Sequence, residues 1–182
     1  YNIARELAVK YPVTVVRRTE AQGLASAVVR GIHEAAGDRL VVTDADLQHP
    51  PALIPKLISK LDDADIVVGS RLAEGGSFGD FSILRRGMTI CANLLAHICL
   101  SDARRVQDVQ SGFFAMKRSV VVDSELSPTG YKILLEILVV GDYDEVTEVG
   151  YNFCERSAGD SSIGLDTIIN YIYHLIDLWI RS

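Results

Sequence analysis

The sequence predicts an α/β fold in which helices flank a mostly parallel sheet, built as one domain over residues 1–182. Short apolar runs of strand length alternate with longer segments whose apolar residues recur every three or four positions, which is the spacing of an amphipathic helix. Strands and helices that alternate in this way form βαβ units with parallel strands. A chain of this length can bury a core large enough to fold alone.

The first half of the chain shows the alternation most clearly. Strands are expected at Val13–Val16, Leu40–Thr43 and Ile66–Val68. A helix is expected between the first two strands, from Gly23 to Ala36, and Gly37 is placed to end it. The next helix opens at Pro50 and Pro51, because proline is tolerated in the first turn of a helix.

The second half adds further elements and two polar loops. Helices are expected at Ile83–Leu100, at Tyr131–Val140 and from Leu165 to about Ile180, and strands at Gly112–Met116 and Val146–Phe153. The segment Gly75–Ser82 is rich in glycine and polar residues, and we expect a mobile loop there. A second polar loop is expected at Arg156–Gly164.

The start of the chain does not fit a complete sheet. Residues Tyr1–Ala8 have the pattern of a helix end, and no strand precedes them. We therefore expect the first strand of the sheet to be missing. Tyr1–Lys10 should form a helix that lies on the sheet, beside an open sheet edge where the earlier strand belongs.

The last expected helix carries an apolar stripe at helical spacing. The stripe consists of Leu165, Ile168, Ile169, Ile172, Leu175, Ile176 and Trp179. Core packing is the favoured interpretation. The alternative is a helix that lies close to a membrane, although Asp166 and Asp177 on its polar face would repel anionic lipid.

Composition excludes several classes of protein. The formal net charge of −6 argues against nucleic-acid binding, which usually requires a basic face. Three cysteines, an odd number with no closely spaced pair, argue against a disulfide framework and fit a reducing compartment. No apolar run reaches the roughly 18 residues that a membrane-spanning helix needs. Any phosphate site in so acidic a chain must be built from local cations.

The strongest chemical signal follows the strand Leu40–Thr43. Asp44 and Asp46 are two residues apart, so in an extended chain their carboxylates share one face. Such acids at the carboxyl end of a strand lie where parallel sheets bind ligands. Together with Gln48 they offer hard oxygen ligands for Mg²⁺ or Mn²⁺, which in turn would hold a diphosphate. The alternative is that one acid caps the next helix.

His49 follows this group directly and precedes two prolines. Its imidazole could be a metal ligand or an acid–base group. The favoured interpretation is an ordinary loop residue.

Arginines stand near the expected strand ends and polar loops. They are Arg71, Arg85, Arg86 and Arg156. In an acidic chain these positions indicate oxyanion binding, because arginine stays charged and forms paired hydrogen bonds with phosphate. For Arg85 and Arg86 a solvated helix start is an equal alternative. A weaker signal is Asp108–Phe114, in which Gly112 permits a close backbone approach and the aromatic residues are more often plain core.

Five strings in this order resemble the dolichyl-phosphate mannose synthases, which are family-2 glycosyltransferases with a GT-A fold. The strings are Gly23–Ala27, Asp44–Pro51, Gly69–Arg71, Asp108 with Ser111–Phe114, and Gly130–Glu136. The resemblance runs from about Gly23 to Ser162. The long string from Asp44 to Pro51 is much more specific than two spaced acids alone.

The resemblance implies inverting transfer of mannose from GDP-mannose to a polyprenyl phosphate such as dolichyl phosphate, at the cytoplasmic face of a membrane. It assigns Asp44, Asp46 and Gln48 to an Mg²⁺ or Mn²⁺ site and Ser111 to the nucleotide-sugar site. Phosphate contacts of donor or acceptor are implied for Arg71, Arg86 and Arg156. Asp46, Arg71 and Arg86 are the expected catalytic residues. The acceptor is already an anion, so positioning and electrostatics would carry the catalysis.

Two alternatives stay open. The enzyme could move another sugar, such as glucose from UDP-glucose, to a polyprenyl phosphate. The chain could also be a nucleotide-sugar binding module without catalysis, although the set of Asp44, Asp46 and Gln48 argues against a decayed site.

Overall fold

The structure is a computed structural model that describes residues 1–19, 23–127, 132–154 and 165–182. Its strands are β1 (Arg39–Val42), β2 (Ile66–Ser70), β3 (Phe114–Lys117) and β4 (Val146–Gly150). Its α-helices are α1 (Asn2–Lys10), α2 (Leu24–Glu34), α3 (Ile54–Lys60), α4 (Ile83–Cys99), α5 (Ser119–Val122), α6 (Ile133–Val140) and α7 (Leu165–Arg181). Short 3₁₀ turns occupy Pro51–Leu53 and Asp102–Arg105. The predicted α/β class is confirmed.

The sheet has the strand order β1-β3-β2-β4. β1, β2 and β4 run in the same direction, and β3 lies antiparallel between β1 and β2. Phe114 is therefore the register partner of both Val42 and Val68. The sheet is thus mixed, and the strands expected from consecutive βαβ units are not all neighbours.

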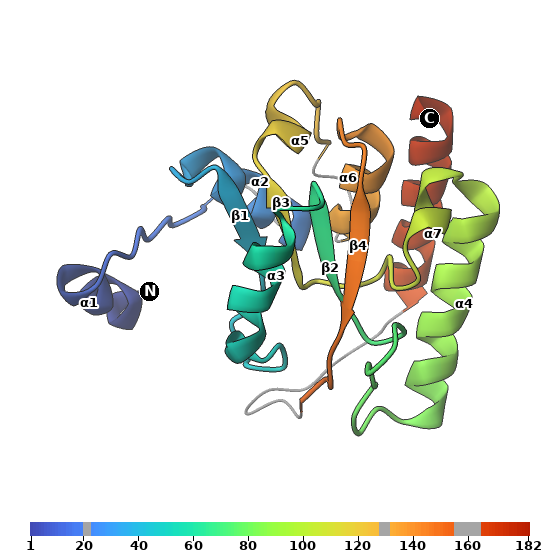
Figure 1. Ribbon diagram of the computed structural model, residues 1–182, viewed down its shortest axis with the longest axis horizontal. Helices are drawn as coiled ribbons and strands as arrows, with labels where there is room; N and C mark the ends of the chain where they lie inside the picture. Colours follow the sequence, from blue (N-terminus) through green and yellow to red (C-terminus); the bar gives the residue numbers. More distant parts are fainter. Residues whose placement is uncertain (20–22, 128–131, 155–164) are drawn as a thin grey trace.

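Each face of the sheet has its own apolar core, because side chains alternate along every strand. On one face, Val67, Phe113 and Ala115 pack with Leu57 and other side chains of the α3 region. The opposite face packs against α2, α4, α6 and α7, and contributes Ile66, Val68, Phe114 and Met116. Figure 1 shows α3 in front of the sheet and the other helices behind or beside it. Phe113 and Phe114 are both fully buried, so their interpretation as core residues is confirmed.

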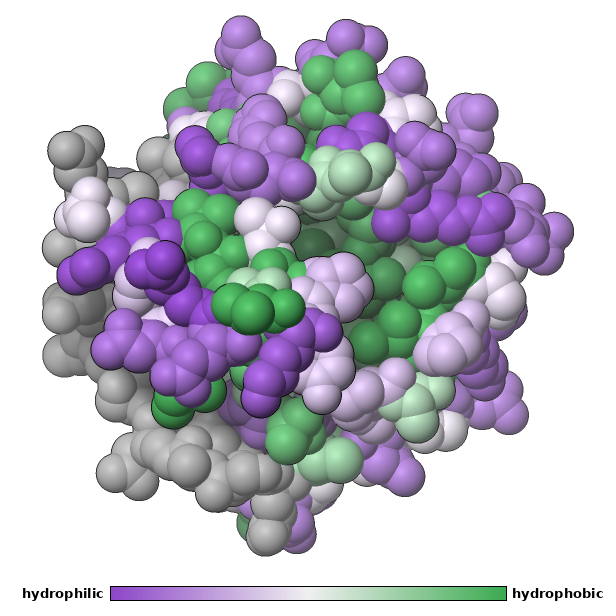
Figure 2. Space-filling view, turned by 90° about the vertical axis from the view of Figure 1, so that its left-hand side faces the viewer, coloured by the Kyte–Doolittle hydropathy of each residue, from purple (hydrophilic) through white to green (hydrophobic). Residues whose placement is uncertain are grey.

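The N-terminal segment differs from the prediction. α1 forms as expected, but it buries no residue and stands apart from the sheet (Figure 1), so its predicted packing was wrong. Residues 13–16 are extended but form no strand, and Val13 and Val16 are 47% and 41% exposed. A segment of strand-forming residues becomes a strand only when its backbone N–H and C=O groups pair with a neighbouring strand. β1 lies at the edge of the sheet, and apolar side chains surround a hollow on this side of the molecule (Figure 2).

The glycine-rich loop Gly75–Ser82 contacts the segment after β4, and its mobility stays a prediction. Ser77 forms a parallel bridge with Asn152, just beyond β4. The Ser77 amide donates to the Tyr151 carbonyl at 3.0 Å, and the Phe153 amide donates to the Ser77 carbonyl at 3.1 Å. Gly79 has φ +54°, and a Cβ built there would lie 2.1 Å from the Phe153 carbonyl oxygen. Gly79 therefore allows a close backbone contact that a side chain would prevent.

The last helix buries a different face from the one that the sequence favoured. Tyr171, His174, Leu175 and Leu178 are buried, whereas most of the predicted stripe is exposed: Ile168, Ile169, Ile172, Ile176 and Trp179. Core packing was therefore the wrong interpretation for the described stripe residues apart from Leu175. Among the described helices, none combines the length and apolarity required to cross a bilayer.

Candidate active site

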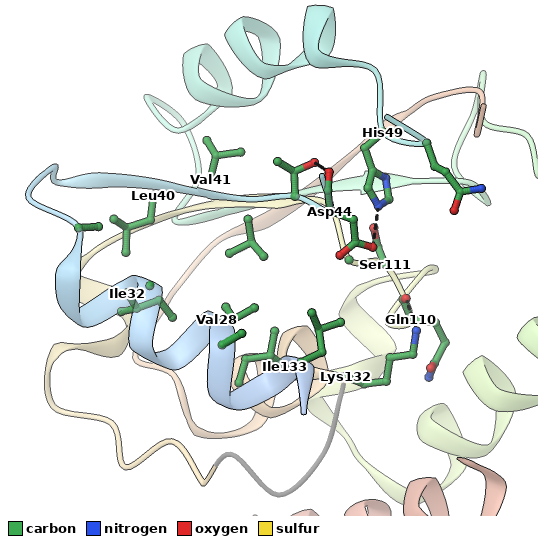
Figure 3. A pocket seen from close by; sticks show the side chains of 18 of the residues that line it. Val28, Ile32, Leu40, Val41, Asp44, His49, Gln110, Ser111, Lys132 and Ile133 are labelled. Atoms are coloured by element: carbon green, nitrogen blue, oxygen red, sulfur yellow. Dashed lines mark hydrogen bonds and ion pairs between the residues drawn. The ribbon is translucent and has the colours of Figure 1, made fainter. Parts of the chain in front are cut away.

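One cavity of about 600 Å³ opens where β1 and β2 end and β3 begins. Figure 3 shows its two ends. Apolar side chains between α2 and β1 form one end, including Val28, Ile32 and Leu40. The polar end contains Asp44, Gln48, His49, Arg71, Arg85, Gln110, Ser111 and Lys132. Because β3 runs antiparallel, its start lies at the same sheet edge as the ends of its two neighbours.

The residues after β1 form a turn instead of continuing the strand. β1 ends at Val42, and the Gln48 amide donates to Asp46 Oδ1 at 3.1 Å. Leu47 has φ +61°, which helps the chain to reverse. Asp44 and Gln48 line the cavity, whereas Asp46 is not among its lining residues. The alternation of an extended strand therefore does not describe this segment, and the expected shared site of all three residues stays a prediction.

The oxygen ligands at the polar end suit a hard divalent cation. Asp44 presents a carboxylate that is 43% exposed, and Gln48 presents an amide whose nitrogen donates to the Cys154 carbonyl at 3.3 Å. Within the described ranges no three His, Cys, Asp or Glu side chains gather closely enough to cage a metal. Mg²⁺ commonly binds through one or two carboxylates and takes its remaining ligands from water and substrate phosphates. Asp44 and Gln48 therefore fit an ion that a diphosphate completes.

Arg71 and Asp108 form a buried ion pair beside this group. Arg71 Nε and Nη2 each donate to the Asp108 carboxylate at 2.7 Å, and the Arg71 amide donates to Oδ2 at 3.0 Å. Burial alone would lower the pKa of Arg71, but the hydrogen bonds and charge of Asp108 outweigh it and raise that pKa. One edge of the guanidinium is thus already engaged, so Arg71 cannot offer that edge to a phosphate.

The predicted arginines are not placed alike. Arg85 lines the cavity and stacks on the Phe81 ring with its guanidinium carbon 3.8 Å from the centroid. Arg86 is exposed, lies outside the cavity lining and donates to the Gly79 carbonyl. Neighbouring positions on a helix point about 100° apart, so only one of the two can face the cavity. The role expected for Arg86 stays a prediction, and Arg156 lies outside the described residues.

Lys132 is a cationic cavity residue that sequence reasoning did not single out. Its Nζ donates to the Gln110 carbonyl at 3.0 Å (Figure 3). Burial, and then the charge of Arg71, lower the pKa of Lys132 to about 8. One feature of the sequence could have identified Lys132. It directly precedes Ile133–Val140, a mostly apolar segment that forms the buried helix α6.

Ser111 and Gly112 shape the cavity floor. Ser111 Oγ donates to the Gly69 carbonyl at 2.6 Å and accepts from the Phe113 amide at 3.1 Å, which ties the loop to β2. A Cβ at Gly112 would lie 3.5 Å from Asp44 Oδ2, so the backbone does approach the acidic group closely. Nucleotide-sugar binding by Ser111 stays a prediction.

Comparisons with known proteins identify relatives of this chain. Residues 1–123 match the model of the family described as glycosyl transferase family 2. A dolichol-phosphate mannosyltransferase of Pyrococcus furiosus is 46% identical over 176 residues, which cover 96% of this chain and 50% of the relative. A dolichol-phosphate mannosyltransferase of Saccharomyces cerevisiae is 34% identical, covering 93% of this chain and 66% of the relative. The chain thus spans about half to two thirds of these relatives.

A solved structure shares the fold. Glucosyl-3-phosphoglycerate synthase from Mycobacterium tuberculosis, in complex with Mn²⁺, uridine diphosphate and glucosyl-3-phosphoglycerate, superposes with a TM-score of 0.62. It is 21% identical, and the match covers 93% of this chain and 57% of that chain. This likeness supports the arrangement of sheet and helices.

The buried ion pair predicts a large loss of stability in Asp108→Ala. The variant leaves Arg71 buried without its partner, and we expect the free energy of unfolding to fall by about 3–5 kcal/mol. Asp62→Ala is the control, because it also breaks an ion pair between an arginine and an aspartate, at 2.6 Å from Arg39, but this pair is exposed. That control should change the free energy by at most about 1 kcal/mol. Urea unfolding measures both, and equal losses would contradict the structural role of Asp108.

Proposed function

This chain belongs to glycosyl transferase family 2, and we propose that it is the catalytic part of an enzyme that transfers mannose from GDP-mannose to a polyprenyl phosphate such as dolichyl phosphate. One observation carries the proposal: a single cavity combines the oxygen ligands of Asp44 and Gln48 with cationic side chains of Arg71, Arg85 and Lys132. Donor diphosphate and acceptor phosphate are both anionic, so a site for both needs this set of charges. The dolichol-phosphate mannosyltransferases among the relatives support the choice of sugar and acceptor.

A divalent cation, Mg²⁺ or Mn²⁺, is part of the proposal. Asp44 and Gln48 would hold it, with Asp46 as the further ligand that the sequence pattern indicates. When bound, the ion neutralises the diphosphate that leaves the sugar. The Mycobacterium tuberculosis synthase that shares the fold was solved with Mn²⁺ and uridine diphosphate, which supports a metal-dependent site of this kind.

The cavity residues would act by positioning and by electrostatics. An acceptor phosphate oxygen is already a nucleophile, so its attack on the anomeric carbon requires no strong base, and an in-line attack inverts that carbon. Arg85 projects from the start of α4 into the cavity, where its charge can offset that of the acceptor. Lys132 places a second cation in the same cavity. Preorganised charges of this kind lower the barrier without rearranging during the reaction.

We also place the enzyme at the cytoplasmic face of a membrane, where a polyprenyl phosphate is available. α4 and α7 lie side by side (Figure 1) and contact each other. Both expose large apolar side chains, namely Ile83, Leu84, Ile90, Leu94, Ile98, Ile172, Tyr173, Ile176, Trp179 and Ile180. Exposed apolar faces of this extent mark interaction surfaces, and a lipid surface fits the acceptor. The three exposed free cysteines suit a reducing compartment.

Transfer assays test the proposal directly. The enzyme is incubated with polyprenyl phosphate in detergent and with GDP-mannose or UDP-glucose, with and without EDTA. We expect mannosyl transfer that needs Mg²⁺ or Mn²⁺, and a product of inverted anomeric configuration by nuclear magnetic resonance. A higher kcat/KM for UDP-glucose supports the alternative sugar, whereas nucleotide-sugar binding without transfer supports a binding module.

Arg85 and Arg86 provide a matched pair of variants. We expect Arg85→Ala to lower kcat/KM for the acceptor at least about 100-fold, because a charge beside the developing transition state is lost. Arg86→Ala removes the same side chain one position further along α4, outside the cavity lining, and should have an effect below about fivefold. The donor dissociation constant should change little in both. The reverse ranking would favour the assignment of Arg86 that the sequence resemblance implies.

Lys132 predicts a pH dependence. With a pKa of about 8, its ammonium group is present below that pH and is lost above it. We therefore expect kcat/KM for the donor to fall as pH rises through about 8, since this parameter reports groups of the free enzyme. Lys132→Gln should be slower at pH 7 and should lack this decline. A wild-type profile retained in Lys132→Gln would assign the titration to another group.

A further inference from the structure

We propose that His49 is a positioning residue that orients the Asp44 carboxylate for the divalent cation, and that Tyr151 fixes His49 from behind. This inference rests on the proposed function. His49 Nε2 lies 3.6 Å from Asp44 Oδ2, and His49 Nδ1 lies 2.8 Å from the Tyr151 hydroxyl. Figure 3 shows the imidazole directed toward the Asp44 carboxylate at the polar end of the cavity. The sequence favoured an ordinary loop residue here, yet the side chain is only 4% exposed.

Aromatic side chains hold the imidazole in one orientation. Its centroid lies 5.1 Å from that of Phe113, 5.7 Å from that of Tyr151 and 5.5 Å from that of Phe153. These rings come from the segment before β3 and the segment after β4, and all three are buried. A ring enclosed in this way cannot change rotamer without moving its neighbours. Each ring nitrogen therefore keeps its partner.

The contacts select one tautomer of His49. Burial raises the pKa of the Tyr151 hydroxyl, so that group keeps its proton and can donate to Nδ1. The proton of a neutral imidazole then resides on Nε2, which faces the carboxylate of Asp44. The other tautomer would turn a lone pair toward a negative charge. The arrangement thus directs an N–H group at Asp44 without requiring a charged histidine.

We expect the contact with His49 to restrict rotation of the Asp44 carboxylate. The Asp44 side chain is 43% exposed and lies two residues beyond the end of β1, an edge strand. A ligand that is already oriented loses less entropy when a cation binds. Partners behind metal ligands commonly contribute 10- to 100-fold in metal affinity, roughly, and the same range is expected here.

Binding of Mn²⁺ alone tests the inference, with the free ion measured by electron paramagnetic resonance. His49→Phe should weaken Mn²⁺ binding by about 10- to 100-fold. His49→Gln can place an amide N–H near the position of Nε2 and should stay within about threefold of wild type. His49→Asn places its amide near the position of Nδ1, does not reach Asp44, and should resemble His49→Phe. Tyr151→Phe removes the partner of Nδ1 and should give a smaller loss.

The variants separate this inference from the function on which it rests. Asp44→Asn should abolish Mn²⁺ binding, and wild-type affinity in that variant would overturn the proposed metal site itself. Loss in Asp44→Asn with wild-type affinity in His49→Phe would overturn the role of His49 alone. Equal affinities of His49→Gln and His49→Asn would also overturn it, because a purely structural role does not distinguish the two amides. This comparison decides the question even if His49→Phe fails to fold.

Discussion

The ion pair between Arg71 and Asp108 connects the parts of the molecule that build the cavity. Arg71 follows β2 directly, and Asp108 lies in the loop that leads to β3. Glu148 of β4 holds the same loop, because its carboxylate accepts from the amides of Gln107 and Asp108. Three adjacent strands are thus joined through the Asp108 loop, and the Asp108 carboxylate itself is fully buried. The loop carries Gln110, Ser111 and Gly112, so the shape of the cavity floor depends on this pair.

The antiparallel insertion of β3 explains why the floor lies where it does. A parallel strand in that place would begin at the opposite edge of the sheet and would carry its preceding loop away from Asp44. Because β3 runs the other way, Gly112 comes close to both Asp44 and His49. Phe113 and Phe114 pack in opposite cores, because successive side chains point to opposite faces of the sheet. The fold therefore places a loop from the second half of the chain against a strand end from the first.

Sequence reasoning identified the elements better than their surroundings. Periodicity located α2, α4 and α7 closely, because amphipathic spacing is a local property of the chain. It could not show that residues 13–16 lack a strand partner, since pairing depends on distant segments. For α7 it found apolar residues but chose the wrong buried face, because apolar side chains occur on both faces of that helix. The antiparallel direction of β3 likewise depends on tertiary contacts, so local periodicity could not predict it.

The same distinction applies to the cavity. The types and spacing of Asp44 and Gln48 indicated a polar strand end, and both line the cavity. Residue type and spacing did not show which of Arg85 and Arg86 faces the cavity, because the orientation of a helix about its own axis depends on tertiary packing. Lys132 was overlooked because its significance comes from burial beside Arg71 and Gln110, which lie far away in the sequence. The burial of His49 could not be predicted for the same reason, since its partner Tyr151 is 102 residues away.

The geometry of α4 links the cavity to the exposed apolar face. Arg85 occupies the first turn of this helix and faces the cavity, while Ile90, Leu94 and Ile98 are exposed further along it. In the proposed function this face would rest on a bilayer, and α4 would then connect the bilayer to the cavity that Arg85 lines. An acceptor could then keep its hydrocarbon chain in the bilayer and present only its phosphate. In that arrangement the search for the acceptor would be diffusion in two dimensions, and the surface density of the acceptor, not its bulk concentration, would set the rate of encounter.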